Sequence, residues 1–318
     1  MPSRKTIFLV LRIAASSVML ALLLSRIHLS SLLPRDHGTA VAWLVVGLAI
    51  WIGATVLATM RWQRVLSALE LPTDLSRLLS HSFAGLFVAN FLPTTIGGDV
   101  LRVTRLSATN GQAPASFASV VLERLTGFLV LPMITLVALA THPALLHLGR
   151  ASHLALLFSL GTLVLLSVIL VLAANPRLGK RLAENQSWLR FVGAVHLGVD
   201  RIRRHPSAVA GVLLTAVAYQ LALVVAAWTA TQALGIDLGW APVMAFLPVV
   251  AMAQVLPVSV NGLGLREGAL VLLLQPLGVP TAQAVALGLL LYGMNLAVSL
   301  LGAPAFAVGA RAPARAAA

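Results

Sequence analysis

Charged side chains lie within or beside stretches of this chain that are otherwise apolar. Seven of them stand out: Asp99, Arg102, Arg105, Glu123, Arg124, Arg266 and Glu267. Charges in such surroundings are costly, rare and usually functional. A guanidinium can bind a phosphate through two parallel hydrogen bonds, and a neighbouring acid offsets part of its charge. The chemistry that these residues favour is therefore the binding of an anionic phosphate group.

The predicted substrate-binding set consists of three arginines, three acids and two asparagines: Arg102, Arg124, Arg266, Asp99, Glu123, Glu267, Asn90 and Asn261. We expect the arginines to converge on the phosphate of an anionic lipid, while the acids orient them or exchange protons. Helix N-termini at Gly98 and Gly264 would add backbone N–H donors. The alternative is that the charges form structural ion pairs at a membrane interface.

An internal repeat places two of these arginines at equivalent positions. Residues 89–103 recur as residues 253–267, a shift of 164, with six identical positions that include Pro, Gly and Arg in register. Each copy is an apolar run that is interrupted before its arginine. The predicted breaks are Pro93, Gly97, Gly98, Pro257, Gly262 and Gly264, because proline removes a helix donor and glycine permits a turn. Paired interrupted segments of this kind point to the binding site of a transporter.

The composition predicts a membrane protein. The chain is 59% hydrophobic and 10% charged, whereas soluble domains average roughly 25% charged residues. The net charge of +13 is better explained by orienting loops and touching anionic lipid than by nucleic-acid binding. Cysteine is absent, which excludes disulfides and thiolate metal sites. His142, His147 and His153 are spaced poorly for a metal, and no nucleotide motif is visible, so we expect no cofactor.

Several segments are apolar enough to cross a bilayer, which requires about 20 residues. The predicted fold is an all-α polytopic membrane protein with six full transmembrane spans, at 7–25, 40–60, 117–140, 153–174, 207–234 and 281–305. The stretches 78–97 and 242–275 contain the breaks and are predicted to be re-entrant. Backbone freed at membrane depth must line a cavity or be buried in protein.

Loop charges predict the orientation, since cytoplasmic loops carry an excess of arginine and lysine. Segment 175–206 holds seven cations and is expected to be a cytoplasmic amphipathic linker that senses lipid or is simply anchored by its arginines. Loops 61–77 and 98–114 also carry arginines, so 78–97 must enter from the cytoplasm and return. The two repeats, 40–174 and 207–305, then have inverted topology. Both termini are predicted to lie in the cytoplasm, at the bacterial inner membrane.

Three motifs occur in order along the chain: Pro93-x-x-x-Gly97-Gly98-Asp99-x-x-Arg102, Glu123-Arg124-Leu125, and Asn261-Gly262-Leu263-Gly264-Leu265-Arg266-Glu267-Gly268. Together they resemble the lysylphosphatidylglycerol synthase transmembrane family, also called flippase-like. In bifunctional members the membrane portion moves aminoacylated phosphatidylglycerol between leaflets and a cytoplasmic domain makes that lipid. Because this sequence ends soon after Ala310, we expect a stand-alone member without the synthase domain.

The resemblance implies a lipid translocase that moves an anionic or lipid-linked headgroup between leaflets. The third motif is similar to that of stand-alone members associated with hopanoid, glycolipid or polyprenyl-linked sugar pathways. The expected partners are therefore membrane lipids of the phospholipid, polyprenyl-linked or hopanoid type, and a biosynthetic enzyme. Two alternatives stay open, an integral-membrane transferase acting on a lipid-linked substrate and an accessory lipid-binding subunit.

Overall fold

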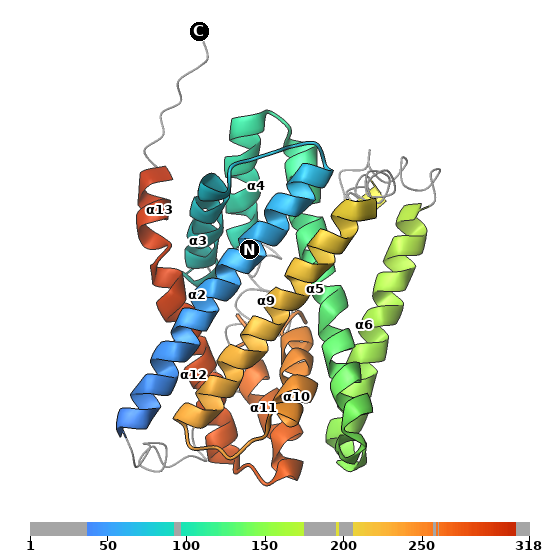
Figure 1. The fold of residues 1–318 in the computed structure, drawn as a ribbon, viewed down its shortest axis with the longest axis vertical. Coiled ribbons are helices and arrows are strands. Elements are labelled where there is room, and N and C mark those ends of the chain that lie inside the picture. Colours follow the sequence, from blue (N-terminus) through green and yellow to red (C-terminus); the bar gives the residue numbers. More distant parts are fainter. Residues whose placement is uncertain are drawn as a thin grey trace, which may run out of the picture. The chain divides into compact units, whose positions relative to one another are not determined.

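The computed structural model describes residues 37–91, 97–174, 195–196, 206–256, 259 and 261–309. Among them the regular elements are all helices (Figure 1). The predicted first span 7–25 lies outside the described residues, and so do Pro93, Pro257 and nearly all of the basic segment 175–206. The expectations for those parts stay predictions.

The helices, in chain order, are α2 (His37–Ala68), α3 (Leu75–Phe91), α4 (Gly97–Asn110), α5 (Ala113–Thr141), η2 (Pro143–His147), α6 (Arg150–Ala174), α9 (Pro206–Ala233), α10 (Trp240–Ala253), α11 (Leu265–Leu274), η3 (Gln275–Leu277), α12 (Thr281–Leu300) and α13 (Ala303–Gly309). Five of them, α2, α5, α6, α9 and α12, are long and apolar enough to cross a membrane. The chain is therefore a multi-pass membrane protein whose described part is all helical. The count of six spans and the re-entrant inverted repeat remain predictions.

Two segments that the sequence assigns to loops are mostly helical. α2 continues past Arg61 to Ala68, and α4 occupies most of the segment 98–114. The physical reason is that arginine ends a hydropathic run without ending a helix, because its long unbranched stem suits helical backbone. The last predicted span, 281–305, is also divided, since α12 ends at Leu300 and α13 follows a turn at Gly302.

The described residues form two compact units, whose boundaries fall inside long helices. The first unit draws on the described residues within Met1–Ala54, Leu125–Ile169 and Ala216–Met294. The second unit draws on the described residues within Thr55–Arg124, Leu170–Thr215 and Asn295–Ala318. Each unit has a hydrophobic core of its own, which fixes the charged residues within it.

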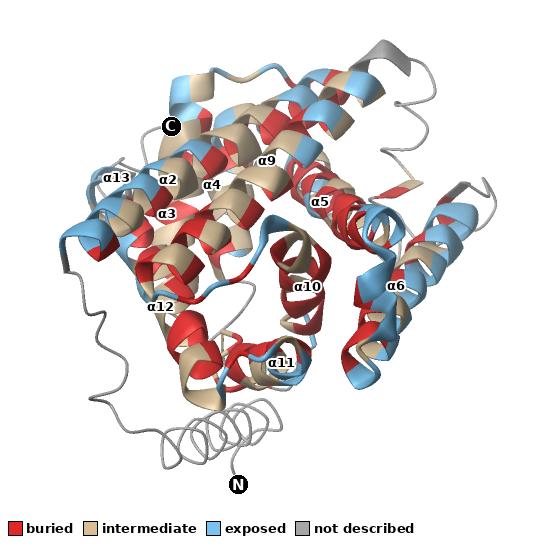
Figure 2. Cartoon of the chain, turned by 60° about the horizontal axis from the view of Figure 1, so that its bottom comes forward, coloured by how far each residue is buried: buried red, intermediate tan, exposed pale blue. Residues whose placement is uncertain are grey.

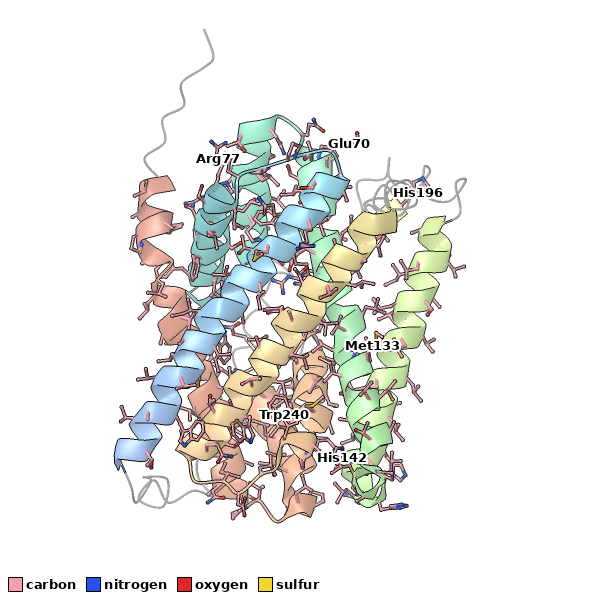
Figure 3. The ribbon with its side chains drawn as sticks, viewed as in Figure 1. Glu70, Arg77, Met133, His142, His196 and Trp240 are labelled. Atoms are coloured by element: carbon pink, nitrogen blue, oxygen red, sulfur yellow. The ribbon has the colours of Figure 1, made fainter. Side chains whose placement is uncertain are left out.

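The core of the first unit gathers around α10 and α11, where Figure 2 shows buried residues on both helices. Phe246 and Leu270 are fully buried there. Trp240 at the start of α10, labelled in Figure 3, meets Trp228 of α9 edge to face, with ring centroids 6.2 Å apart. Tryptophan is enriched where a membrane meets water, so this pair is placed as an interfacial anchor would be.

Large apolar side chains point outward on α6. Leu157, Val164 and Val171 are each more than 60% exposed, and Figure 2 shows much of that helix as exposed. A soluble protein rarely leaves a continuous apolar face open to water. Facing lipid, the same surface is satisfied, which agrees with the assignment of α6 as a span.

Candidate functional site

Arg61 and Glu123 form a buried ion pair in the second unit. Arg61 Nη2 donates a hydrogen bond to Glu123 Oε1, and the two side chains are 4% and 5% exposed. Arg61 lies within α2, and Glu123 lies on α5 about three turns from its start. A buried carboxylate that lost its cation would be strongly unfavourable, so this pair holds the two helices together at a fixed register.

Arg102 of α4 extends the pair into a larger group. Arg102 Nη1 lies 3.3 Å from Glu123 Oε2 and 3.3 Å from Asp99 Oδ1. Arg124, the next residue of α5, reaches Asp99 Oδ2 with its Nη2 at 2.9 Å. Each of the two acids therefore bridges two arginines. We call this set of five residues the buried ion cluster: Arg61, Asp99, Arg102, Glu123 and Arg124.

The ring of Trp62 packs against the guanidinium of Arg102. The guanidinium carbon of Arg102 lies 4.1 Å from the centroid of the Trp62 ring, which is a cation–π contact. The indole itself is fixed, because its Nε1–H donates to Ser119 Oγ at 3.0 Å and its side chain is fully buried. The plane of the Arg102 guanidinium is thereby set by packing as well as by its acids.

Two glycines allow α3 and α4 to approach closely enough to bury Arg102. A side chain at Gly98 would meet the backbone oxygen of Gly85, and a side chain at Gly85 would meet the stem of Arg102 at 3.0 Å. α4 begins at Gly97, within one residue of the predicted helix start at Gly98. Gly98 of the first motif therefore serves helix packing, and the turn that the sequence predicts before it stays a prediction.

The buried ion cluster carries one more cation than anions, because three guanidiniums face two carboxylates. Its members differ in exposure. The Arg124 side chain is 51% exposed and that of Asp99 is 20% exposed, while Arg102 and Glu123 are at 11% and 5%. A surplus positive charge with one accessible arginine suits the binding of an anion, since a guanidinium can bind an anion through paired, charge-assisted hydrogen bonds.

In the first unit the third motif forms a tight turn before α11. Asn261, Gly262 and Gly264 all have positive φ angles, of 52°, 76° and 80°. The Glu267 carboxylate folds back onto this turn, where its Oε2 accepts the Gly264 N–H at 2.6 Å. Arg266 donates from Nη2 to the Asn261 carbonyl oxygen at 3.3 Å. The glycines are needed here, because left-handed backbone is strained for most other residues.

Arg266 and Glu267 are both buried, at 7% and 0% exposure of their side chains. The Arg266 guanidinium lies 5.2 Å from the Tyr292 ring centroid and its Nε lies 3.7 Å from Glu267 Oε1. Gly288 of α12 makes room for the acid, since a side chain there would meet Glu267 Cγ at 2.8 Å. Arg102 and Arg266 thus each lie over an aromatic ring within their own unit.

The structure brings four of the eight predicted binding residues together in the second unit, namely Asp99, Arg102, Glu123 and Arg124. Three others, Asn261, Arg266 and Glu267, meet in the first unit. Asn90 lies on α3 and its side chain accepts a hydrogen bond from Asn295 at 3.0 Å. That the two groups join in one site stays a prediction, because they belong to separate units.

Sequence reasoning missed three residues of these two groups. Arg61 had the appearance of a flanking charge at the end of a span, although it is 3% exposed. Trp62 lies in a segment that the sequence assigns to the end of a span, and Tyr292 is interpreted from the sequence as a packing residue within the last span rather than as a ligand. The only signal for Arg61 was an arginine directly after a clean apolar run. Among the described residues no group of histidines and acids is arranged to hold a metal.

A comparison with protein families assigns the chain to a known family. Residues 9–302 match the model of the lysylphosphatidylglycerol synthase TM region, so the chain belongs to that family. The matched range contains all three motifs and every residue of the buried ion cluster. No curated protein matches the chain. The membership supports a membrane protein related to lipid metabolism.

Proposed function

We propose that this protein is a lipid translocase that moves an anionic or lipid-linked headgroup between the leaflets of a bacterial inner membrane. The observation that carries the proposal is the buried ion cluster, which has a surplus guanidinium inside an otherwise apolar membrane protein. Charge at that position is expensive unless it serves a substrate. Family membership supports a lipid as that substrate.

Arg102 and Arg124 are the proposed phosphate ligands. Arg124 is half exposed and already bends toward Asp99, so it is the residue that a headgroup meets first. Arg102 Nε has no hydrogen-bond partner within the described part of the chain, although it is buried. A phosphate oxygen would satisfy that donor. Asp99 would then release one of its two arginines, and the phosphate would replace Asp99 as the partner of that arginine.

The proposed architecture is the inverted-topology repeat, with α3–α4 and α10–α11 as its two interrupted segments. Two observations support it: α3 ends at Phe91 whereas α4 begins at Gly97, and residues 261–264 form a turn. In this proposal both termini face the cytoplasm, and Arg266 is the pseudo-symmetric counterpart of Arg102. The acids are not symmetric, because Asp99 corresponds to Leu263 and Glu123 to Leu287.

A transferase that acts on a lipid-linked substrate is less well supported. It would need a carboxylate or base that is ready to accept a proton from a substrate hydroxyl. The best candidate is Asp99, but both of its oxygens are engaged by arginines. An accessory lipid-binding subunit would share the site and lack movement, so only a transport measurement separates it from a translocase.

The test is reconstitution into proteoliposomes that contain fluorescent lipids of defined headgroup, with leaflet exchange followed by dithionite quenching. We expect exchange of an anionic phospholipid to be accelerated by the wild-type protein and reduced about tenfold or more in Arg102→Gln and Arg124→Gln, given hydrogen bonds to a charged group worth about 1.5–3 kcal/mol each. Arg150→Gln is the matched control, because Arg150 is an exposed residue at the start of α6.

Equal exchange by wild type and Arg102→Gln would remove the proposed role of the cluster. Chemical conversion of the lipid, measured on the same vesicles by mass spectrometry, would instead favour the transferase. Binding without either exchange or conversion would favour the accessory subunit. Each variant is first checked for monodispersity in detergent, so that loss of exchange is not loss of folding.

A further inference from the structure

Within the second unit, α3 is contacted by α4 on one side and by the α12–α13 segment on another (Figure 1). Toward α4, Gly85 lies against the start of that helix. Toward the α12–α13 segment, a side chain at Gly302 would meet the backbone oxygen of Phe83, and Asn90 accepts a hydrogen bond from Asn295 at 3.0 Å. The α3–α4 hairpin is therefore attached, along one side of α3, to the segment that ends in α13.

Arg105 of α4 joins this hairpin directly to α13. Its Nη1 donates to the Ala305 carbonyl oxygen at 3.1 Å and its Nη2 to the Phe306 carbonyl oxygen at 3.0 Å. Phe306 is among the last four residues of α13, whose carbonyl groups have no partner within the helix. A cation that caps such carbonyls is also favoured by the helix dipole. One guanidinium thus connects α4 to the end of α13.

The Phe306 side chain adds an aromatic contact to these hydrogen bonds. Its ring lies 5.8 Å from that of Phe87 on α3, centroid to centroid. The guanidinium carbon of Arg105 lies 5.9 Å from the same Phe306 ring, within the range of a weak cation–π contact. Phe306 therefore contacts both helices of the hairpin.

α13 is held by few buried contacts. None of the residues 303–308 is buried, and Phe306 and Val308 are 37% and 72% exposed. α4, in contrast, buries Leu106 fully in the core of the second unit. Elements with few buried apolar contacts open locally at low free energy, and an isolated helix as short as α13 is only marginally stable. α13 can therefore detach and unwind while the rest of the unit stays folded.

We propose that α13 is a releasable strap across α3 and that Arg105 is the latch that holds it. While the two hydrogen bonds of Arg105 are intact, the α3–α4 hairpin is fixed to the α12–α13 segment. When they break, the hairpin is free to shift, and it carries Asp99 and Arg102 with it. The link to transport rests on the proposed function, because alternating access moves one part of a carrier against another.

Detachment is measured first without transport, as hydrogen exchange of the α13 amides in detergent, followed by mass spectrometry. We expect Arg105→Gln to speed this exchange about tenfold or more, because hydrogen bonds from a charged donor are lost. Phe306→Ala should speed it as well. Val308→Ala is the matched control on the same helix and should exchange as wild type does, since that side chain points outward. An unchanged rate in Arg105→Gln would overturn the latch.

A crosslink tests whether release is needed for transport. The chain contains no cysteine, so thiols introduced by Phe87→Cys and Phe306→Cys can be joined specifically with a short, reducible crosslinker. In proteoliposomes, leaflet exchange of a short-chain labelled anionic phospholipid is then followed by extraction with albumin. We expect the joined protein to fall to the protein-free rate and to recover on reduction. Each single-cysteine variant, treated identically, is the control.

The outcomes separate a releasable strap from a fixed brace. Equal lipid exchange by the joined and the reduced protein would show that α13 stays attached, and it would overturn the proposal. So would slower lipid exchange in Arg105→Gln than in wild type, because a releasable strap predicts a rate at least equal to that of wild type. If wild type exchanges no lipid but Arg105→Gln speeds hydrogen exchange of α13, the latch stands and the proposed function falls.

Discussion

Glu123 of α5 and Arg102 of α4 are joined by an ion pair of 3.3 Å between Oε2 and Nη1, across 21 residues of sequence. The other oxygen of Glu123 is taken by Arg61 of α2. One buried carboxylate therefore connects three helices. Arg102 also contacts Asp99. A substrate that draws Arg102 away from Glu123 must therefore disturb the contact with Asp99 too.

We predict that Glu123→Gln destabilises the fold. Removing the carboxylate leaves two buried guanidiniums facing a neutral amide, and breaking a buried pair from one side typically costs about 3–5 kcal/mol. The measurement is thermal unfolding in detergent, where the midpoint should fall clearly below that of wild type. Asp237→Asn is the control, since Asp237 is an exposed acid in the loop before α10. A midpoint equal to that of the control would mean that the ion cluster does not hold these helices.

A conservative change at Arg102 should not preserve transport. Lysine keeps the charge of Arg102 but loses the guanidinium, whose Nη1 contacts both acids and whose carbon lies over the Trp62 ring. We predict that Arg102→Lys lowers leaflet exchange by roughly tenfold or more, as the loss of a charged hydrogen bond worth about 1.5–3 kcal/mol implies. Arg150→Lys should leave exchange at the wild-type rate. Full activity in Arg102→Lys would show that only charge matters at this position.

Most of the cluster could be predicted from the sequence, because its members stand next to interruptions that hydropathy exposes. Asp99 and Arg102 follow the first break by one turn of helix, and Glu123 with Arg124 opens an apolar run. Such local contrasts are visible in one sequence. The spacing of three between Asp99 and Arg102 also predicts their pairing on one helix face.

The rest depended on distant packing. Arg61 pairs with an acid 62 residues away, and Trp62 lies under an arginine 40 residues away. No local pattern encodes such partners, because a hydropathy profile records where charge begins and not where a helix ends. The same limit explains why α4 was assigned to a loop, since 14 residues of mixed polarity give no long apolar run.

The close approach of α3 and α4 should be sensitive to one methyl group. Gly98→Ala places a side chain against the Gly85 backbone oxygen, which cannot move aside as a flexible side chain would. Overpacking of this kind typically costs about 1–3 kcal/mol. We predict a lower unfolding midpoint for Gly98→Ala and no loss for Gly53→Ala, where α2 leaves open space around the glycine. Equal behaviour of the two variants would contradict the tight crossing.

The stability of the folded protein should decrease as the pH falls, and part of that decrease should depend on His81. Its pKa is about 4 in the folded protein against 6.5 in the unfolded chain. Between these values the unfolded chain binds more protons, so the free energy of unfolding decreases as the pH falls from 6.5 toward 4. Burial of the ring opposes its protonation most, and the charges of Arg105 on α4, Arg77 on α3 and Arg102 on α4 lower the pKa in the same direction.

Unfolding midpoints at pH 8 and pH 5 test this for wild type and His81→Gln. Wild type should lose more stability than the variant over that interval, because the glutamine has no proton to gain. A parallel decline of the two proteins would assign the pH dependence to other groups and would remove the evidence for a neutral, buried imidazole.

The turn before α11 should depend on a glycine of α12. Glu267 accepts the Gly264 N–H while its stem packs against Gly288, so a methyl group at 288 would displace the acid from the turn. We predict that Gly288→Ala lowers the free energy of unfolding by about 1–3 kcal/mol, the typical cost of overpacking. The unfolding midpoint should fall accordingly. Gly293→Ala lies five residues further along the same helix with open space around it, so it should be neutral or stabilising, as alanine favours helix over glycine by roughly 0.5–1 kcal/mol. If the two substitutions change the unfolding midpoint in opposite directions, the effect at Gly288 comes from the contact with Glu267 and not from helix propensity. Changes in the same direction would show that the position of Glu267 does not depend on Gly288.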